Sequence, residues 1–194
     1  NNILMSGKPY LFTIPVRDAS QNRLIMDTKL CFDRKEQGKF LARIENAYRK
    51  APYFGHTAGL IREITEYGEE SLTAYAEYSI KRIADYLGIQ TAVMRSSEIP
   101  KDNFLTGQDR IIEICRCLHA DTYINPSGGR ALYQRERFMQ SRIKLYFLDT
   151  RFDRVEYRQY GGEFVGKLSI IDVLMFNPVE RVRGFLEEYE LNGR

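Results

Sequence analysis

The alternation of β-type and helix-type runs across residues 89–149 is the feature that most constrains the fold. Runs rich in β-branched and aromatic residues alternate there with runs of helical periodicity. The predicted strands are 90–95, 122–125 and 143–149, and the predicted helices are 106–119 and 130–141. Because the connections are short, this β-α-β-α-β order favours a parallel sheet with helices on its faces. We therefore expect the three strands to be mutually parallel.

The flanking segments predict a hairpin before this region and helices after it. "PYLFTIPV" and "RLIMDTKLCF" have β-type composition, whereas "KEQGKFLARIENAYRKA" and "EESLTAYAEYSIKRIADYLG" have helical periodicity. The elements expected here are hairpin strands 9–16 and 23–32, helices 35–51 and 69–88, a polar loop 150–167, and helices 169–176 and 178–189. The sequence thus predicts a single α/β domain over residues 1–194. We expect a three-layer sandwich with a mostly parallel central sheet, an N-terminal hairpin and C-terminal helices.

The composition is that of a globular protein with no membrane-spanning segment. Hydrophobic residues make up 43% of the chain and charged residues 28%, and no apolar run approaches the roughly 18 residues of a membrane helix. No secretory signal is present near residue 1. Cys115 and Cys117 lie two positions apart, on different sides of the predicted helix. We expect Cys31, Cys115 and Cys117 to be free thiols, Cys115 to be buried, no structural metal, and a cytoplasmic protein without direct membrane insertion.

The stretch "DTYINPSGGRALYQRERF" carries the strongest signal for a ligand site. Ser127, Gly128 and Gly129 lie in the short connection between its predicted strand and its predicted helix, and Arg130 is the first residue of that helix. Glycines let backbone amides approach a phosphate, Ser127 can donate a hydrogen bond, and Arg130 adds positive charge beside a helix N-terminus. The alternative is a tight turn whose glycines only supply positive φ. The combination favours a phosphate or anion site formed by these four residues and Tyr133 on the first helical turn.

The charge distribution points to a small anionic ligand rather than to nucleic acid. The net charge of the chain is only +3, too weak for the footprint of a nucleic-acid-binding protein. Residues 130–158 alone carry +4, which leaves −1 for the remainder. This local basic region, next to the glycine-containing loop, would attract a phosphate or a carboxylate.

"GGEFVGKLS" (161–169) imitates a phosphate-binding motif without its context. Gly161, Gly166 and Lys167 have the spacing of a Walker A loop, but Leu168 stands where a magnesium-binding Ser or Thr is required. No β-type run precedes the glycines. We therefore interpret this segment as a loop that ends at a Ser169 helix cap.

The remaining polar candidates carry weaker signals. In "RKAPYFG" (49–55) a proline–aromatic corner favours packing, although Lys50 and Tyr53 could face a ligand and are retained as accessory candidates with Asp109. The two histidines, at 56 and 119, have no Cys or Asp at ligand spacing. We therefore expect no zinc site.

Six blocks of the sequence together resemble the WbqC-like family. These are "RKAPYF", "LGIQT", "TGQDRIIEIC", "YINPSGGRALYQRERF", "IKLYFLD" and "YRQYGGEFVGKLSIIDVLMFN", in matching order and spacing. The likeness runs from about residue 9 to the end. Family members usually begin with a further strand-and-helix segment of the form H-Q-P-x-x-x-P-W, which we expect this chain to lack.

The resemblance implies a role in bacterial surface-polysaccharide (O-antigen) biosynthesis, with transfer of glycine or another amino-acyl group onto an amino sugar. The fold resembles, by analogy, adenylyl-transferring α/β enzymes, in which a Ser-containing loop before a late helix holds phosphates. "PSGGR" occupies that place here. ATP or a nucleotide-linked sugar is the ligand that this analogy implies.

Two functions of different class fit these observations. The first is an amino-acyl transferase or ATP-dependent ligase, in which the amides of 127–129 and Arg130 hold a phosphate or an oxyanion. Asp109 or Asp149 would be its base, with helix capping and strand-end packing as their competing roles. The second is a noncatalytic module that binds a sugar nucleotide or assembles partner enzymes of the polysaccharide pathway. Sugar-nucleotide binding without turnover would distinguish them.

Overall fold

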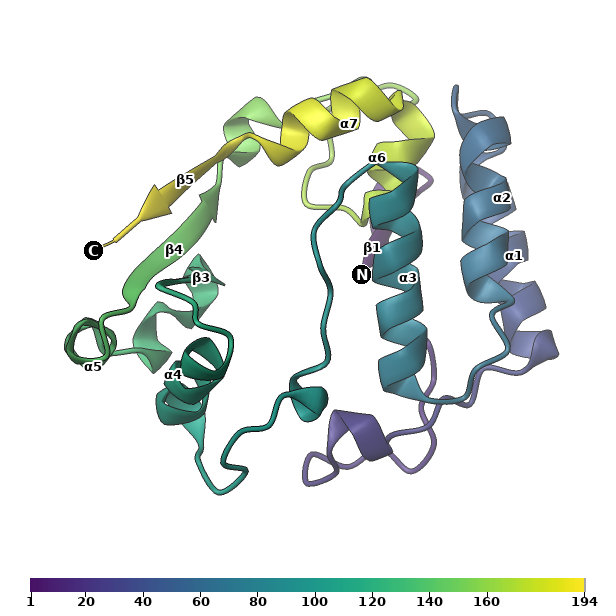
Figure 1. Cartoon of the computed structure of the whole chain (residues 1–194). Coiled ribbons are helices and arrows are strands. Elements are labelled where there is room, and N and C mark those ends of the chain that lie inside the picture. The colour runs from purple at the N-terminus through teal and green to yellow at the C-terminus, as the bar shows by residue number, and fades with distance from the viewer. Residues whose placement is uncertain (194) are drawn as a thin grey trace. The chain divides into compact units, whose positions relative to one another are not determined.

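The computed structural model describes residues 1–193 and shows a mixed α/β protein (Figure 1). The chain divides into two compact units. Unit 1 consists of Asn1–Val93 and Phe152–Leu186, and unit 2 consists of Met94–Arg151 and the segment from Glu187 onward. The predicted α/β class is confirmed. The single domain stays a prediction, because compactness of each unit does not show whether the two unfold together.

Unit 1 begins with a tight hairpin. β1 (Asn2–Met5) pairs antiparallel with β2 (Lys8–Leu11), and Met5 lies opposite Lys8. The two-residue turn between them has positive φ at both positions, 51° at Ser6 and 74° at Gly7, as tight hairpin turns require. An N-terminal hairpin is therefore present, at an earlier position than predicted.

The predicted pairing of strands 9–16 and 23–32 is wrong. Only an isolated bridge joins Val16 to Leu30, and the middle of the second segment forms a 3-10 helix, η1 (Ile25–Asp27). Residues 24–26 are three consecutive apolar residues, all more than half exposed. Such a run lacks the alternation that turns one face of a strand toward a core, and β2 already pairs with β1.

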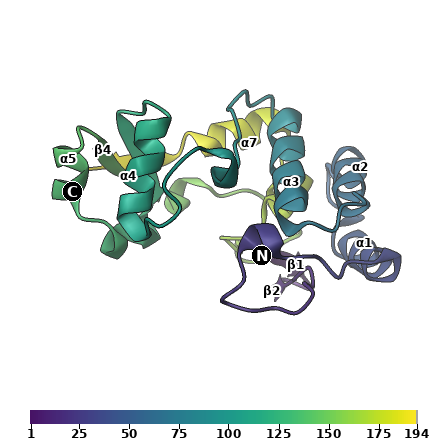
Figure 2. The same cartoon turned by 60° about the horizontal axis from the view of Figure 1, so that its bottom comes forward.

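Three helices follow in unit 1, namely α1 (Arg34–Tyr48), α2 (Phe54–Thr65) and α3 (Leu72–Tyr86). The Asp33 side chain caps α1 by accepting from the amide of Glu36 (2.9 Å), and Ser71 caps α3 by accepting from the amide of Ala74 (3.3 Å). α2 packs against both neighbours (Figure 2). α1 and α3 confirm two predicted helices, whereas α2 was not anticipated.

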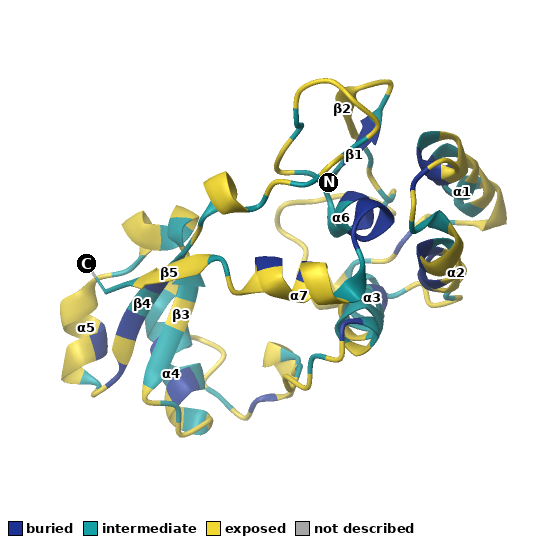
Figure 3. Ribbon diagram, turned by 90° about the horizontal axis from the view of Figure 1, so that it is seen from above, coloured by how far each residue is buried: buried dark blue, intermediate teal, exposed yellow. Residues whose placement is uncertain are grey.

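The C-terminal part of unit 1 supplies the middle of its core. It contains η4 (Phe152–Arg154), α6 (Ile170–Phe176) and α7 (Val179–Leu186). α6 is buried on nearly every side (Figure 3) and packs against α2 and β1. Leu174 and Met175 are among its fully buried side chains. The predicted helix 169–176 is thus confirmed as the central helix of this unit.

Unit 2 contains a three-stranded sheet in the order β3-β4-β5. β3 (Thr122–Pro126) runs parallel to β4 (Lys144–Thr150), with Asn125 opposite Phe147, which confirms the predicted parallel pair. β5 (Tyr189–Asn192) pairs antiparallel with β4, so the predicted helix 178–189 is too long. It ends at Leu186 because the free edge of β4 offers backbone hydrogen bonds to the residues that follow.

Helices cover one face of this sheet. The helical elements of unit 2 are η2 (Ser96–Glu98), α4 (Gly107–Cys117), η3 (Ser127–Leu132) and α5 (Arg135–Gln140). α4 and α5 both contribute buried side chains, Ile112, Cys115 and Phe138, to the cluster that holds Leu145 and Phe147 of β4. Cys115 is buried as predicted. The predicted helix 130–141 is instead a 3-10 turn followed by a shorter α-helix.

The predicted strand 90–95 is wrong, and the three-layer sandwich with a mostly parallel sheet is not confirmed. Residues 89–95 form no strand, and the boundary between the units falls after Val93. This segment connects the two units, and no strand of either sheet lies beside it to pair with. The β3-β4-β5 sheet therefore has one parallel and one antiparallel pair.

Candidate functional site

The candidate site lies at the carboxyl edge of the parallel pair in unit 2. β3 ends at Pro126, and η3 begins at once with Ser127, Gly128 and Gly129. Asp149 lies near the end of the neighbouring parallel strand β4. Since the carboxyl ends of parallel strands meet at one edge of a sheet, the chain places the glycine-containing turn and this carboxylate together.

Arg130 is held in a fixed orientation across this edge. Its Nη2 donates to Asp149 Oδ2 (2.5 Å), and its guanidinium carbon lies 5.2 Å from the centroid of the Phe147 ring. The guanidinium therefore rests between a carboxylate and an aromatic face while its side chain stays 41% exposed. Such an orientation can present a guanidinium to a ligand without a large loss of rotamer freedom.

Asp149 is an ionised carboxylate surrounded by donors. Asn192 of β5 donates to its Oδ2 (2.7 Å), and Ser127 and Arg130 also donate to it. The hydrogen bonds from Asn192 and Ser127, together with the charge of Arg130, hold the pKa of Asp149 below its usual value. Asp149 is therefore charged at neutral pH, which suits it to bind an amine or hydroxyl groups and makes it a weak general base.

The two glycines of the turn have different physical explanations. A β-carbon at position 129 would lie 2.1 Å from the Asn125 amide nitrogen, so any other residue there would force the Asn125 side chain to move. A β-carbon at position 128 would meet no atom within 4 Å, and Gly128 does not have positive φ. Neither packing nor backbone conformation explains Gly128, which is the residue that the close approach of a ligand to the backbone would explain.

Tyr133 belongs more to the core of unit 2 than to the exposed edge. Its ring contacts those of Phe138 and Phe147, and its hydroxyl lies 3.2 Å from that of Tyr123. Tyr123 in turn donates to Asn125 Oδ1 (2.9 Å). This chain of hydrogen bonds fixes Asn125, the side chain that packs against Gly129.

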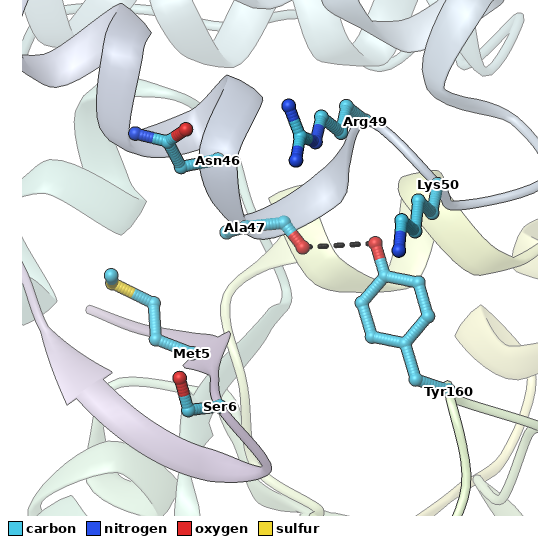
Figure 4. Close-up of a pocket in the computed structure, with 7 residues that line it drawn as sticks. All are labelled: Met5, Ser6, Asn46, Ala47, Arg49, Lys50 and Tyr160. Atoms are coloured by element: carbon cyan, nitrogen blue, oxygen red, sulfur yellow. Dashed lines mark hydrogen bonds between the residues drawn. The ribbon is translucent and has the colours of Figure 1, made fainter.

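The accessory candidates are divided between the two units. Asp109 lies in unit 2 and forms an ion pair with Arg137 of α5. Thr106, the residue just before α4, makes no side-chain cap hydrogen bond. Lys50 and Tyr53 lie in unit 1, where Lys50 lines a pocket with Tyr160 (Figure 4). The backbone amide of Tyr53 donates to the Met175 carbonyl (3.1 Å).

Sequence reasoning missed two groups that the structure reveals. Asn192 comes to Asp149 only because β5 adds to the sheet, and its segment was expected to follow a helix. Asp172 lies within the predicted helix 169–176, and its side chain is fully buried and accepts from Tyr48 (2.7 Å), Tyr157 (2.7 Å) and Gln159 (3.1 Å). All donors to Asp172 are internal, so we interpret it as an anchor of the C-terminal loop.

Residues 1–193 contain neither a cluster of metal-binding side chains nor a helix able to cross a membrane. No group of three or more His, Cys, Asp or Glu side chains in this part of the chain is placed to hold a metal ion. Over the same residues, every helix is too short or too polar to cross a membrane.

A comparison with known protein families identifies the family to which this chain belongs. The model of the WbqC-like protein family matches residues 1–184, which is nearly all of the sequence. The chain belongs to the WbqC-like family. Neither the curated proteins nor the solved structures gave a match. Membership of the WbqC-like family fits a protein of a polysaccharide pathway, at the level of the family.

The WbqC-like match includes most of the candidate site. The turn 127–130 and Asp149 lie inside the matched residues, whereas Asn192 lies beyond them. The donor that contributes most to the low pKa of Asp149 therefore comes from residues that the family model does not match.

Proposed function

We propose that this protein transfers an amino-acyl group, such as glycyl, to a nucleotide-linked amino sugar in bacterial surface-polysaccharide (O-antigen) biosynthesis. The observation that carries the proposal is the edge formed by Ser127–Arg130 and Asp149. One side of this edge offers backbone amides and a guanidinium to a phosphate, and the other offers an ionised carboxylate to an amine. A nucleotide-linked amino sugar carries both groups.

In this proposal the phosphates lie against the amides of 127–129 and the guanidinium of Arg130. Gly128 has open space around it, so a phosphate oxygen can come close to the backbone there. A bound phosphate competes with Asp149 for Arg130, and Asp149 then turns toward the amine of the sugar. If the reaction first activates the amino acid with ATP, pyrophosphate leaves as the adenylate forms, and AMP leaves when the amine of the sugar attacks the acyl carbon.

The low pKa of Asp149 supports a second function, in which the protein binds the sugar nucleotide without turnover. Amide formation requires that the amine lose a proton, and a carboxylate of lowered pKa is a poor acceptor for it. A noncatalytic protein would present the sugar nucleotide to partner enzymes of the pathway. The two functions share the binding site and differ in product formation.

The test is a thermal-shift and turnover panel with ATP, UDP- and dTDP-linked amino sugars, and glycine. We expect stabilisation by an amino-sugar nucleotide and a ten- to hundred-fold weaker affinity in Arg130→Ala, roughly the value of one charge-assisted hydrogen bond. Lys144→Ala is the matched control, since Lys144 is exposed at the opposite end of β4. A glycylated sugar detected by mass spectrometry supports the transferase. Binding without product supports the noncatalytic function, and no binding of any nucleotide contradicts both.

A further inference from the structure

A second cluster of cations lies in unit 1, at the C-terminal end of α1. Arg49 and Lys50 follow the last residue of this helix, and both are exposed. Within residues 1–193, neither side chain forms an ion pair, although many other cations of unit 1 pair with nearby carboxylates. Two adjacent cations without a carboxylate partner carry charge that an anionic ligand could neutralise.

These cations line a concave pocket rather than a convex surface. The pocket has a volume of about 580 Å³ and its lining residues are Met5, Ser6, Asn46, Ala47, Arg49, Lys50 and Tyr160. Figure 4 shows three sources for them: the end of α1, the β1–β2 turn, and the loop that carries Tyr160. No acidic side chain is part of this lining. The pocket combines two positive charges with an amide and a hydroxyl, all able to donate hydrogen bonds.

Two walls of the pocket are held in place, one by a hydrogen bond and the other by a tight turn. The Tyr160 hydroxyl donates to the Ala47 carbonyl (2.9 Å), which ties the C-terminal loop to the last turn of α1 (Figure 4). On the opposite wall, the tight hairpin turn holds Ser6 at a φ of 51°. This conformation is uncommon for a residue with a β-carbon, and glycine would adopt it with less strain. Ser6 therefore places a hydroxyl at a position where the backbone favours glycine.

The competing explanation is that Arg49 and Lys50 only compensate the negative end of the α1 dipole. Cations near a helix C-terminus do stabilise helices. That effect accounts for the charge alone, and it requires neither a concave wall nor the donors Ser6 and Asn46 on either side. The other end of α1 carries a second adjacent pair, Arg34 and Lys35, so cations on this helix are not confined to its favourable end.

We propose that this pocket binds a small phosphate monoester, such as a sugar phosphate. A phosphate monoester carries a charge between about −1.5 and −2 at neutral pH and has three acceptor oxygens. Arg49 and Lys50 match its charge, and Asn46 and Ser6 supply further donors at the walls. The volume of about 580 Å³ lies within the range of small-molecule sites and leaves room for the organic part of the ligand.

The test is calorimetric titration of the whole protein with glucose 1-phosphate, and with glucuronate as a carboxylate of similar size. The double variant R49A/K50A removes the cations of the pocket. R34A/K35A is the matched control, because it removes the same charge from the other end of the same helix. Arg130→Ala separates this site from the edge in unit 2, and circular dichroism verifies that each variant is folded.

We expect glucose 1-phosphate to bind the wild-type protein and to bind R49A/K50A at least ten-fold more weakly, with R34A/K35A and Arg130→Ala unchanged. Ser6→Gly should weaken binding by a smaller factor while the hairpin is retained. Four outcomes overturn the proposal: no binding to the wild type, equal weakening in R34A/K35A, weakening only in Arg130→Ala, or equal affinity for glucuronate. Loss only in Arg130→Ala would support the edge in unit 2 while it contradicts this pocket.

Discussion

Replacement of Asp172 by alanine should destabilise the protein by disrupting a buried hydrogen-bond network. Asp172 is fully buried and accepts hydrogen bonds from Tyr48, Tyr157 and Gln159. Tyr48 is also fully buried, and its hydroxyl accepts from the Leu4 amide (2.8 Å). Without Asp172, the Tyr48 hydroxyl still accepts from the Leu4 amide, but its own proton has no acceptor. Tyr157 and Gln159 are half-buried and can donate to water instead.

The magnitude follows from these contacts. One buried unsatisfied hydroxyl costs about 1–3 kcal/mol, and the space left by the carboxylate adds a cavity term. Burial of the Asp172 carboxylate costs desolvation free energy, which is why its pKa is raised above its usual value. The alanine variant avoids this cost, which offsets part of the loss. We therefore expect a net loss of about 2 kcal/mol in the free energy of unfolding, or roughly 4–8 °C in Tm for a chain of this length.

The assay is urea unfolding followed by far-ultraviolet circular dichroism. Asp153→Ala is the matched control, since Asp153 is an exposed aspartate of the same unit. A control of this kind should change stability by no more than about 0.5 kcal/mol. If Asp172→Ala were as stable as Asp153→Ala, Asp172 would not be an anchor, and a functional role for its buried carboxylate would have to be considered.

Three further predictions follow from the structure. Gly129→Ala should weaken nucleotide binding and lower Tm, because its β-carbon collides with the Asn125 amide. Gly128→Ala should weaken binding and leave Tm unchanged, because its β-carbon meets no atom. Thermal shift with and without nucleotide measures Tm and binding for each variant. Because the folded-state pKa of Asp172 is raised, the part of the stability that comes from binding its proton is fully present below about pH 4 and is lost as pH rises through the folded pKa, whereas its hydrogen bonds from Tyr48, Tyr157 and Gln159 remain. Urea unfolding from pH 4 to 7 should therefore show the wild type losing stability relative to Asp172→Asn, and parallel curves would contradict this. Cys115 is buried, and burial raises its pKa, so a maleimide should label it far more slowly than the exposed Cys31; equal rates by mass spectrometry would contradict the buried position.

Local patterns predicted the elements whose partners lie nearby in sequence. The parallel pairing of 122–125 with 143–149 followed from a short helical connection, because such a crossover leaves few alternatives. α1 and α3 followed from helical periodicity. α2 had a readable signal that was missed, since its buried residues Thr57, Leu60, Ile61 and Ile64 have helical spacing. Its glycines obscured the pattern because glycine is a poor helix former.

The remaining errors concern pairing that distant segments decide. β5 forms because the edge of β4 is open, which nothing in the composition of 189–192 reveals. The segment 90–95 has β-type residues, but it lies at the boundary of the two units and has no strand beside it.

The candidate site was predicted in part by the same local logic. The turn 127–130 was identified from its residue types and its place after a strand, whereas Asn192 reaches Asp149 only through β5. Of the residues that line the pocket of unit 1, the sequence identified only Lys50 as a candidate. Its walls come from three segments far apart in the sequence, so the pattern around Lys50 could not reveal it.

The central claim is that the backbone amides of residues 127–129 contact the phosphates of a nucleotide-linked amino sugar. The most direct measurement is an NMR titration of the uniformly ¹⁵N-labelled protein with UDP-glucosamine. The account predicts that the amide resonances of Ser127, Gly128 and Gly129 shift and reach saturation together, and that Arg130→Ala weakens this titration while Lys144→Ala does not. If UDP-glucosamine left these three amides unshifted, whether or not it bound elsewhere on the protein, the claim would be contradicted.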